Sequence, residues 1–294
     1  MSFLITTDTS CDLPKNELEK LGVPYIPLTY TIDDKTYVDD FTQDVQYENF
    51  YKLIKSGAMP TTSQINSFLH EKFFCELFNK GHREILHLSI SSGLSTTYNC
   101  AVLGAECAME KHPGLVVKVI DTLSATQAHR ALLDKALDLR KENLDLQLTA
   151  STLDGLKNNL QAYVFVDNLM HLKRGGRISG AAAHVGTLLK IKPVLTIDSL
   201  GKLTVINKAN GIKKAMTYGI EMLLKNINDI KNSTIYLANT DANDKIEELI
   251  SMLRQRGYQG KIVTGWIGPV IGSHTGAGTF GLVFFGNTRI QNKG

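Results

Sequence analysis

The chain has 294 residues, of which 43% are hydrophobic, and its 32 Lys and Arg residues against 29 Asp and Glu residues give a formal net charge of +3. This length suits two domains or one large domain, and this hydrophobic content supplies a buried core, which excludes a disordered chain. The chain contains no long run of one charge sign, so a nucleic-acid-binding stripe is not expected.

The N-terminus and the cysteines favour a cytoplasmic protein. The opening run from Met1 reaches Asp8 without a basic segment and without an apolar stretch long enough for a signal peptide or a membrane span. The four cysteines have neither Cys-x-x-Cys spacing nor the density of a disulfide scaffold, a pattern typical of free thiols in a reducing compartment. We expect a cytoplasmic location and no stable membrane insertion.

The first half of the chain predicts three units in which a strand, a polar loop and a helix follow one another. The expected strands cover 3–7, 84–90 and 115–120, and the helices that follow them begin near 12, 96 and 125. A hairpin over 23–38 and a helix over 47–54 are expected between the first two units. Strands that alternate with helices favour a parallel sheet covered by helices, whose loops gather at the carboxyl ends of the strands.

Polar residues 141–150 suggest a domain boundary near 150, with an N-terminal α/β domain over 1–150 and a C-terminal domain over 151–294. The second half predicts strands at 162–166, 234–238, 261–266 and 280–285, a hairpin of 194–198 with 203–206 around Gly201, and helices at 181–189, 211–227 and 243–256. This mixture indicates an α/β domain with a mixed or partly antiparallel sheet.

Two hydroxyl-rich segments are candidates for anion binding. Thr62 either satisfies local backbone groups in a turn before a helix near Ser67, or donates its hydroxyl to a ligand carboxylate. In the loop 91–95, one serine is explained by a helix cap, whereas Ser92, Gly93 and Ser95 together also suit a bound anion at a helix entrance.

His274 and a basic glycine loop over 173–180 form a second group of candidates. A lone histidine is often structural, but His274 precedes Thr-Gly-Ala-Gly, so the backbone N–H groups near Gly276 could join it in holding a carboxylate or phosphate. Arg177 either lies in a solvated turn or makes a fork-like contact with phosphate or an acidic partner. No His-Glu-x-x-His or comparable ligand set supports a metal site.

The sequence signals that are typical of serine hydrolases and of P-loop nucleotide-binding enzymes are missing from this chain. The chain has serines, aspartates and His274, but the serine loop has no Gly-x-Ser-x-Gly nucleophile elbow. The basic glycine loop is not a nucleotide-binding P-loop, because Gly-x4-Gly-Lys-Ser/Thr is missing.

The order of these segments along the chain resembles the DegV family of bacterial fatty-acid-binding proteins. The segments that carry the resemblance are TDTSCDLP (7–14), TSQ (62–64), SSGLSTTY (91–98), VIDT (119–122), KRGGRIS (173–179) with IKP (191–193), and HTGAGT (274–279). They span nearly the whole chain. The chain departs from the usual family pattern at Thr96, Ile65 and Ala277, none of which removes a candidate hydroxyl or the histidine.

The resemblance implies two α/β domains with one long-chain fatty acid, such as palmitate, between them. Its carboxylate would lie near Thr62 and Ser95, with Ser92, Gly93 and His274 close by, and its tail in an apolar tunnel. Arg177 and Gly276 would contact phosphate or a partner, because some members present the acyl carboxylate to a separate fatty-acid kinase subunit.

The resemblance therefore implies a lipid carrier with no cofactor rather than an enzyme. A regulatory sensor that binds lipid, and a hydrolase or phosphotransferase that acts alone, remain alternatives. Burying an acyl chain contributes about 0.8 kcal/mol per CH₂, so we expect the tail to supply most of the affinity and the carboxylate to set the orientation.

Overall fold

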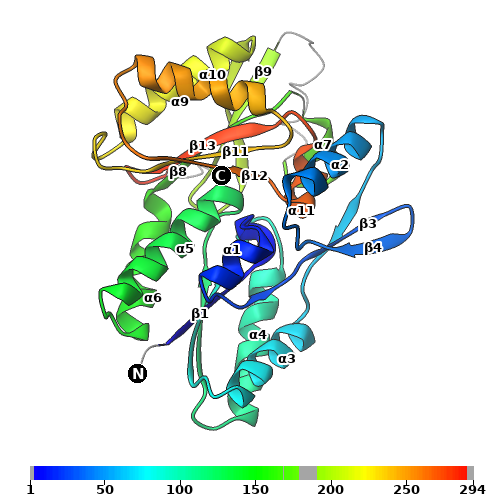
Figure 1. Cartoon of the computed structure of the whole chain (residues 1–294), viewed down its shortest axis with the longest axis vertical. Coiled ribbons are helices and arrows are strands. Elements are labelled where there is room, and N and C mark those ends of the chain that lie inside the picture. Colours follow the sequence, from blue (N-terminus) through cyan, green and yellow to red (C-terminus); the bar gives the residue numbers. More distant parts are fainter. Residues whose placement is uncertain (1–2, 168, 179–190, 290–294) are drawn as a thin grey trace.

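The computed structural model describes residues 3–167, 169–178 and 191–289 (Figure 1). The chain is a mixed α/β protein with a parallel N-terminal sheet, a mixed C-terminal sheet and a small third sheet beside them. The predicted fold class is therefore confirmed.

The N-terminal sheet has four parallel strands in the order β2-β1-β6-β7. Its strands are β1 (Leu4–Asp8), β2 (Tyr25–Ile26), β6 (Glu84–Ser89) and β7 (Val116–Asp121). Strand β6 is buried from its second residue onward, as expected for a central strand covered on both faces. The three strands predicted at 3–7, 84–90 and 115–120 are confirmed.

Six helical segments surround this sheet or connect its strands. They are η1 (Thr9–Cys11), α1 (Lys15–Lys20), α3 (Ser67–Asn79), α4 (Thr97–Lys111), α5 (Thr126–Lys141) and α6 (Leu146–Leu156). Helix α6 overlaps the polar stretch 141–150, in which we predicted no helix. Asp145 caps it by accepting a hydrogen bond from the Leu148 backbone N–H at 2.7 Å, so a helix-start signal was present in that stretch.

The predicted hairpin is confirmed in part. Strands β3 (Thr29–Ile32) and β4 (Lys35–Val38) pair antiparallel, and β5 (Thr61–Ser63) adds to the other edge of β3. Residues 25 and 26, however, belong to β2 in the N-terminal sheet. Pro27 explains this division, because proline has no backbone N–H to continue a ladder. Helix α2 (Asp44–Lys55) lies between β4 and β5 in the chain.

The C-terminal sheet has six strands in the order β10-β9-β8-β13-β11-β12, and the β11–β12 pair alone is parallel. Its strands are β8 (Leu160–Phe165), β9 (Ile191–Ile197), β10 (Leu203–Asn210), β11 (Ile235–Asn239), β12 (Ile262–Trp266) and β13 (Phe280–Phe285). The predicted mixed pairing and the hairpin around Gly201 are confirmed.

The helical segments of this half are η2 (Lys157–Asn159), α7 (Met170–Arg174), α9 (Ile212–Asn226), α10 (Asn243–Gln255) and α11 (Pro269–Thr275). Helices α9 and α10 cover one face of the sheet at the top of Figure 1. Helices α7 and α11 occupy stretches in which we predicted no helix, and α7 overlaps the start of the predicted basic glycine loop. The helix predicted over 181–189 lies outside the described residues.

Helix α5 packs between the two large sheets (Figure 1). One apolar cluster joins its buried face to Ile5 and Leu88 of the N-terminal sheet and to Ala162 and Val283 of the C-terminal sheet. The two halves therefore share a core. The boundary that we expect near 150 falls within α6.

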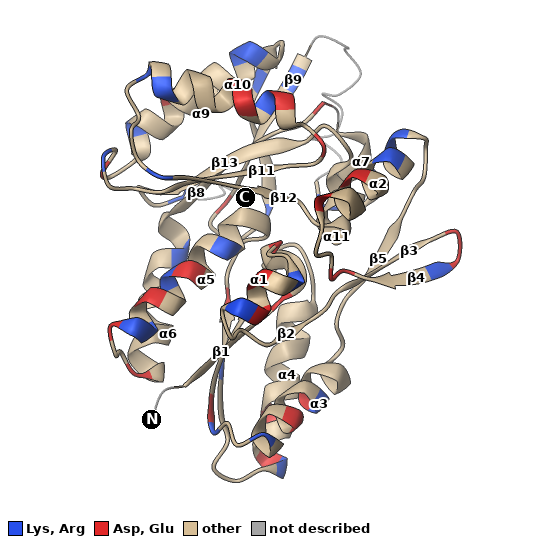
Figure 2. Ribbon diagram, viewed as in Figure 1, with Lys and Arg blue, Asp and Glu red and all other residues tan. Residues whose placement is uncertain are grey.

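Charged side chains of both signs are interspersed on the outer helices (Figure 2). Within residues 3–167, 169–178 and 191–289, no helix is both long enough and apolar enough to cross a membrane.

Candidate functional site

A cavity of about 470 Å³ lies where β5, the loop after β6, the turn after α7 and helix α11 meet. The sequence candidates that line it are Thr62, Ser92, Gly93, Ser95, Arg177 and His274. These residues come from four separate parts of the chain, and folding brings them to one place.

Thr62 and His274 contact each other directly. Strand β5 pairs Thr62 with Tyr30 of β3, so Thr62 lies in a short strand rather than in the turn that we considered. Its Oγ1 lies 2.8 Å from Nε2 of His274, which is in the last turn of α11.

His274 is neutral at pH 7 in this environment. Burial, followed by the charges of Arg177 and Arg174, lowers the pKa of His274 to about 4. Its Nδ1 is buried without a hydrogen-bond partner, and Gly175 packs against that atom.

The tautomer of His274 that fits these contacts carries its proton on Nε2. A buried N–H without a partner would be costly, whereas a proton on Nε2 can be donated to Thr62. The hydroxyl hydrogen of Thr62 is then free to be donated to another acceptor. This arrangement suits an anion bound beside Thr62.

Hydrogen bonds within the serine loop and to Gly201 and Asp121 hold this loop in place. The Ser91 hydroxyl donates to the Gly201 carbonyl at 2.8 Å, the Gly93 N–H donates to Ser91 Oγ at 3.0 Å, and the Ser92 N–H donates to Asp121 Oδ1 at 3.1 Å. The backbone N–H groups of 92 and 93, which we expected to attract an anion, are therefore already occupied. The loop offers hydroxyls to a ligand instead.

Ser95 lies at the entrance to α4. Its Oγ is 2.9 Å from Thr97 Oγ1 and accepts the Thr97 backbone N–H at 3.2 Å. Ser95 precedes the N-cap residue of α4, Thr96, whose side chain makes no cap hydrogen bond, so Ser95 is not the N-cap that we considered. Because the serine hydroxyl has one donor and two acceptor positions, these contacts leave Ser95 able to donate to a ligand.

Arg177 is the one Lys or Arg side chain among the described residues that line this cavity. Its Nε donates to the Leu94 carbonyl at 3.2 Å, and its guanidinium also donates to the Gly175 carbonyl. Burial lowers the pKa of this guanidinium from its usual value, but arginine remains charged at neutral pH. Arg177 supplies positive charge beside Thr62 and His274.

Gly276 does not line the cavity. It ends helix α11 with φ of +77° and packs against the ring of His171. Its role in this structure is to end the helix, because glycine adopts this backbone conformation without strain.

A second cavity, of about 70 Å³, extends the first into the apolar interior. Its lining includes Ala128 of α5, Ala162 of β8, Ala238 of β11 and Leu282 of β13. The residues that line both cavities are Leu94, Leu172, Leu203, Ile271 and Thr275. A polar chamber therefore opens toward an apolar one between α5 and the C-terminal sheet.

Sequence reasoning missed the apolar residues at this junction. Ile271 precedes His274 by three residues and Thr275 by four, a spacing that places all three on one side of a helix. Helix α11 has only seven residues, which is too short for a periodic pattern to predict it.

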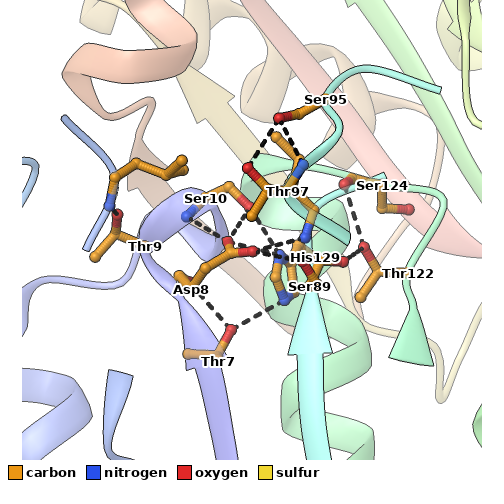
Figure 3. A network of polar contacts seen from close by, with 12 residues as sticks. Thr7, Asp8, Thr9, Ser10, Ser89, Ser95, Thr97, Thr122, Ser124 and His129 are labelled. Atoms are coloured by element: carbon orange, nitrogen blue, oxygen red, sulfur yellow. Dashed lines mark hydrogen bonds and ion pairs between the residues drawn. The ribbon is translucent and has the colours of Figure 1, made fainter. Parts of the chain in front are cut away.

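A buried polar network lies directly behind the serine loop (Figure 3). Asp8 accepts hydrogen bonds from the Ser10 N–H at 3.0 Å, the Ser89 hydroxyl at 3.0 Å and the Ile90 N–H at 2.8 Å. His129 of α5 contacts Thr7 and Ser10, each at 3.0 Å. These side chains are fully buried. The network fixes the ends of β1 and β6, from which the serine loop departs.

No group of three or more His, Cys, Asp or Glu side chains within 3–167, 169–178 and 191–289 is arranged to hold a metal ion. The polar side chains among the described residues that line the chamber carry hydroxyls, the Gln64 amide, one neutral imidazole and one guanidinium. These groups suit a carboxylate or a phosphate.

The chain is similar to known proteins over nearly its whole length. The family that matches residues 2–287 is described as "Uncharacterised protein, DegV family". A DegV domain-containing protein of Clostridium perfringens is 38% identical over 287 residues, which are 98% of each chain. A DegV domain-containing protein of Streptococcus pyogenes is 33% identical over 97% of this chain and 99% of its own.

Solved structures show the same fold. A DegV family protein from Thermus thermophilus, described as binding fatty acid, is 30% identical with a TM-score of 0.86, covering 98% of this chain and 100% of its own. A DegV lipid-binding protein from Thermotoga maritima is 29% identical with a TM-score of 0.84, covering 99% and 100%. DegV of Bacillus subtilis, a fatty-acid-binding protein, is 27% identical with a TM-score of 0.83, covering 98% and 100%. By sequence and by fold, the chain belongs to the DegV family.

Proposed function

We propose that this protein binds a long-chain fatty acid such as palmitate, with its carboxylate in the polar chamber and its tail in the apolar cavity. The observation that carries the proposal is the Thr62–His274 contact beside Arg177, at the polar end of two cavities that share five lining residues. The fatty acids bound by solved relatives of similar fold support the ligand class.

The chemistry of the polar chamber suits a carboxylate. Thr62 has a hydroxyl hydrogen to donate, Ser95 has another, and Arg177 offsets the negative charge. A buried carboxylate is stable only when it is paired and hydrogen-bonded. Ser92 is exposed at the rim of the chamber, so a partner protein can approach the headgroup from that side.

The tail direction follows from the apolar side chains. Leu94, Leu172, Leu203 and Ile271 stand between the two cavities, and burial of a tail beyond them contributes about 0.8 kcal/mol per CH₂. The inner cavity is much smaller than a long acyl chain needs, so these side chains and those lining the inner cavity move apart when the tail enters.

We infer that the protein is a carrier that presents its fatty acid to a separate kinase and that it performs no chemistry itself. Among the described residues that line the chamber, no base contacts the hydroxyl of Ser92 or Ser95: His274 contacts Thr62, and Ser95 contacts Thr97. Arg177 is suited to the phosphate of an acyl phosphate product as well as to the carboxylate. The four cysteines are free, which fits action in the cytoplasm.

Mass spectrometry of organic extracts from gently purified protein tests the proposal. We expect one long-chain fatty acid per protein chain, or uptake of added palmitate by delipidated protein. Repeated absence of extracted lipid together with failure to bind palmitate would overturn the proposed function.

A further inference from the structure

Two buried carboxyl groups meet at the opposite end of α11 from His274. Asp12 follows η1 and Asp39 follows β4, and they are 4% and 5% exposed. Both approach Gly268, the residue that precedes α11. A Cβ built on Gly268 would lie 2.6 Å from Asp12 Oδ1 and 3.2 Å from Asp39 Oδ1. The two carboxyl groups therefore border the same space.

These carboxyl groups have few hydrogen-bond partners. Both side-chain oxygens of Asp12 and Oδ2 of Asp39 are buried without a well-aligned partner in the described part of the chain. The backbone N–H groups of Gly268 and Val270 approach Asp12 and Asp39, respectively. They line a cavity of about 10 Å³, which is close to the smallest space that holds one water molecule. The interior therefore offers little to stabilise two negative charges here.

The surroundings add acids and phenols rather than a buried cation. Lys15 lines the same small cavity, but it is exposed and its Nζ lies 3.9 Å from Asp40. The other titratable groups that face the pair from the elements around it are Asp8, Cys11, Tyr25, Tyr30, Asp40, Asp44, Tyr47 and Tyr51. None of them carries positive charge.

Two carboxylates in such a place cannot both be ionised at neutral pH. Burial, and then the charge of Asp39, raise the pKa of Asp12 well above its usual value, although the Gly268 backbone N–H acts in the opposite direction by hydrogen bonding. Burial also raises the pKa of Asp39 to about 8, although the Val270 backbone N–H acts in the opposite direction by hydrogen bonding. Closely spaced carboxyl groups commonly avoid repulsion by retaining a proton.

We propose that Asp12 and Asp39 retain a proton between them, and that this protonated pair fastens the start of α11 to the N-terminal half of the protein. When Asp39 loses its proton to water, a buried carboxylate remains beside Asp12 and Gly268, with no buried cation among the described residues around it to offset its charge. The start of α11 then loses its position against residues 12 and 39.

The pair can influence the polar chamber through α11. This helix spans seven residues, from Pro269 beside the pair to the turn that holds His274. Val270 and Ile271 line the chamber along the way. A shift at Gly268 therefore changes the Thr62–His274 contact. The pair would act as a pH-sensitive control on the headgroup site.

Trp266 provides a readout that needs no ligand. It is the only tryptophan in the chain and lies two residues before Gly268. Its ring stacks on Tyr47 with centroids 5.4 Å apart, and its Nε1–H donates to Asp44 at 3.0 Å. Because indole emission responds to nearby charge and packing, ionisation of the pair should change the fluorescence of Trp266.

The experiment is a fluorescence titration from pH 6 to 9.5 on the wild type, Asp39→Asn and Asp40→Asn. We expect a transition near pH 8 in the wild type and its loss in Asp39→Asn. Asp40→Asn should keep a transition at a lower pH, because the charge of Asp40 contributes to raising the pKa of Asp39. Asp40 is a matched control, because it is the next residue and lines the same cavity but is not among the atoms nearest Gly268. The same transition in all three proteins would overturn the proposal.

Denaturation at several pH values gives a second test. An acid whose pKa is raised by folding loses stability as pH rises from its unfolded value, near 4, to its folded value. Asp39→Asn should therefore gain stability relative to the wild type between pH 5 and 8. If the free energies of unfolding of Asp39→Asn and the wild type differ by the same amount at every pH, the proposal of a retained proton is contradicted. If Asp39→Asn does not fold, Asp12→Asn makes the same comparison.

Measurements in different salts distinguish a retained proton from a bound metal cation at this pair. The protonated pair predicts equal stabilities in NaCl, KCl, MgCl₂ and CaCl₂ at matched ionic strength. Selective stabilisation of the wild type by one of these cations, lost in Asp39→Asn, would overturn the proposal in favour of a cation site.

The effect on ligand binding rests on the proposed function, so it is measured separately. Palmitate affinity should fall between pH 7 and 9 in the wild type and stay nearly constant in Asp39→Asn. If palmitate does not bind at any pH, the proposed function is wrong, but the Trp266 titration still tests whether Asp12 and Asp39 retain a proton. If palmitate binds with the same pH profile in both proteins, the proposed influence of the Asp12–Asp39 pair on the headgroup site is wrong.

Discussion

At the residue scale, the protonation of His274 connects the polar chamber to pH. Its Nε2 contacts Thr62, its Nδ1 has no partner, and Arg177 and Arg174 lie close enough to disfavour a second positive charge. The chamber therefore takes its positive charge from arginine, while the histidine acts as a neutral donor to Thr62.

This environment predicts acid sensitivity of the folded state. Because folding lowers the pKa of His274 from 6.5 to about 4, the unfolded chain binds more protons between these values, and stability rises with pH across that window. We expect His274→Gln to lose part of this dependence, measured as urea midpoints at pH 4.5 and 7. Other buried histidines contribute in the same direction, so the comparison with the wild type isolates His274. Equal slopes in the two proteins would contradict the assignment.

Removing both headgroup hydroxyls should weaken lipid binding without abolishing it. A hydrogen bond to a charged group contributes about 1.5–3 kcal/mol, whereas the tail supplies the larger share. Thr62→Ala with Ser95→Ala is expected to lower palmitate affinity by at least about tenfold and to leave binding detectable by calorimetry. Thr61→Ala is the matched control, since Thr61 is the preceding residue of β5 and does not line the chamber. Complete loss of palmitate binding by a folded double variant would contradict the expectation that the tail supplies most of the affinity.

At the element scale, the serine loop and the β9–β10 turn fit closely together. A Cβ on Gly93 would lie 2.5 Å from the Leu200 carbonyl oxygen and 2.7 Å from Gly201. The Ser91 hydroxyl donates to the Gly201 carbonyl across the same contact. This contact between loops of the two halves sets one side of the chamber.

Gly93→Ala should therefore push the two loops apart. Overpacking of this kind destabilises proteins by about 1–3 kcal/mol, and we expect palmitate affinity to fall as Ser92 and Ser95 move. Gly155→Ala is the control, because a Cβ there meets nothing within 4 Å and the residue lies inside helix α6. That control should be neutral or stabilising by up to about 1 kcal/mol. If Gly93→Ala has the same free energy of unfolding as the wild type in denaturant titrations, the contact between the serine loop and the β9–β10 turn accommodates the added methyl group without loss of stability.

Sequence reasoning succeeded where the signal was local. The loop 91–95 was predicted because an apolar strand precedes it and a helix follows it. It failed where tertiary contacts decide the structure: α11 is only seven residues long, and the residue before it, Gly268, lies against Asp12 and Asp39 from distant parts of the chain. The contact between Thr62 and His274 joins residues 212 positions apart, so no periodicity encodes it.

At the scale of the whole molecule, the tail would lie between α5 and the C-terminal sheet. The inner cavity is lined mostly by apolar side chains from both halves, including Ala128, Ala162 and Leu282. Small alanines leave room there, and neighbouring leucines close it. The interior that stabilises the fold would then also provide the environment for the ligand.

The affinity for saturated fatty acids should therefore rise with chain length. At about 0.8 kcal/mol per CH₂, each added methylene is expected to strengthen binding about fourfold until the cavity is full. Competition calorimetry with acids of 8 to 18 carbons measures this slope. An affinity independent of chain length would indicate that the tail stays in solvent.

Helix α5 has one consequence for how such a protein could change during evolution. Because its buried side chains contact both large sheets, neither half can be exchanged by recombination without exposing an apolar face of the other. New ligand preferences are then easier to acquire through single substitutions at positions such as Ala128 or Leu203 than through shuffling of halves. Variation among relatives should accordingly concentrate in the side chains around the inner cavity, while the arrangement of the two sheets stays constant.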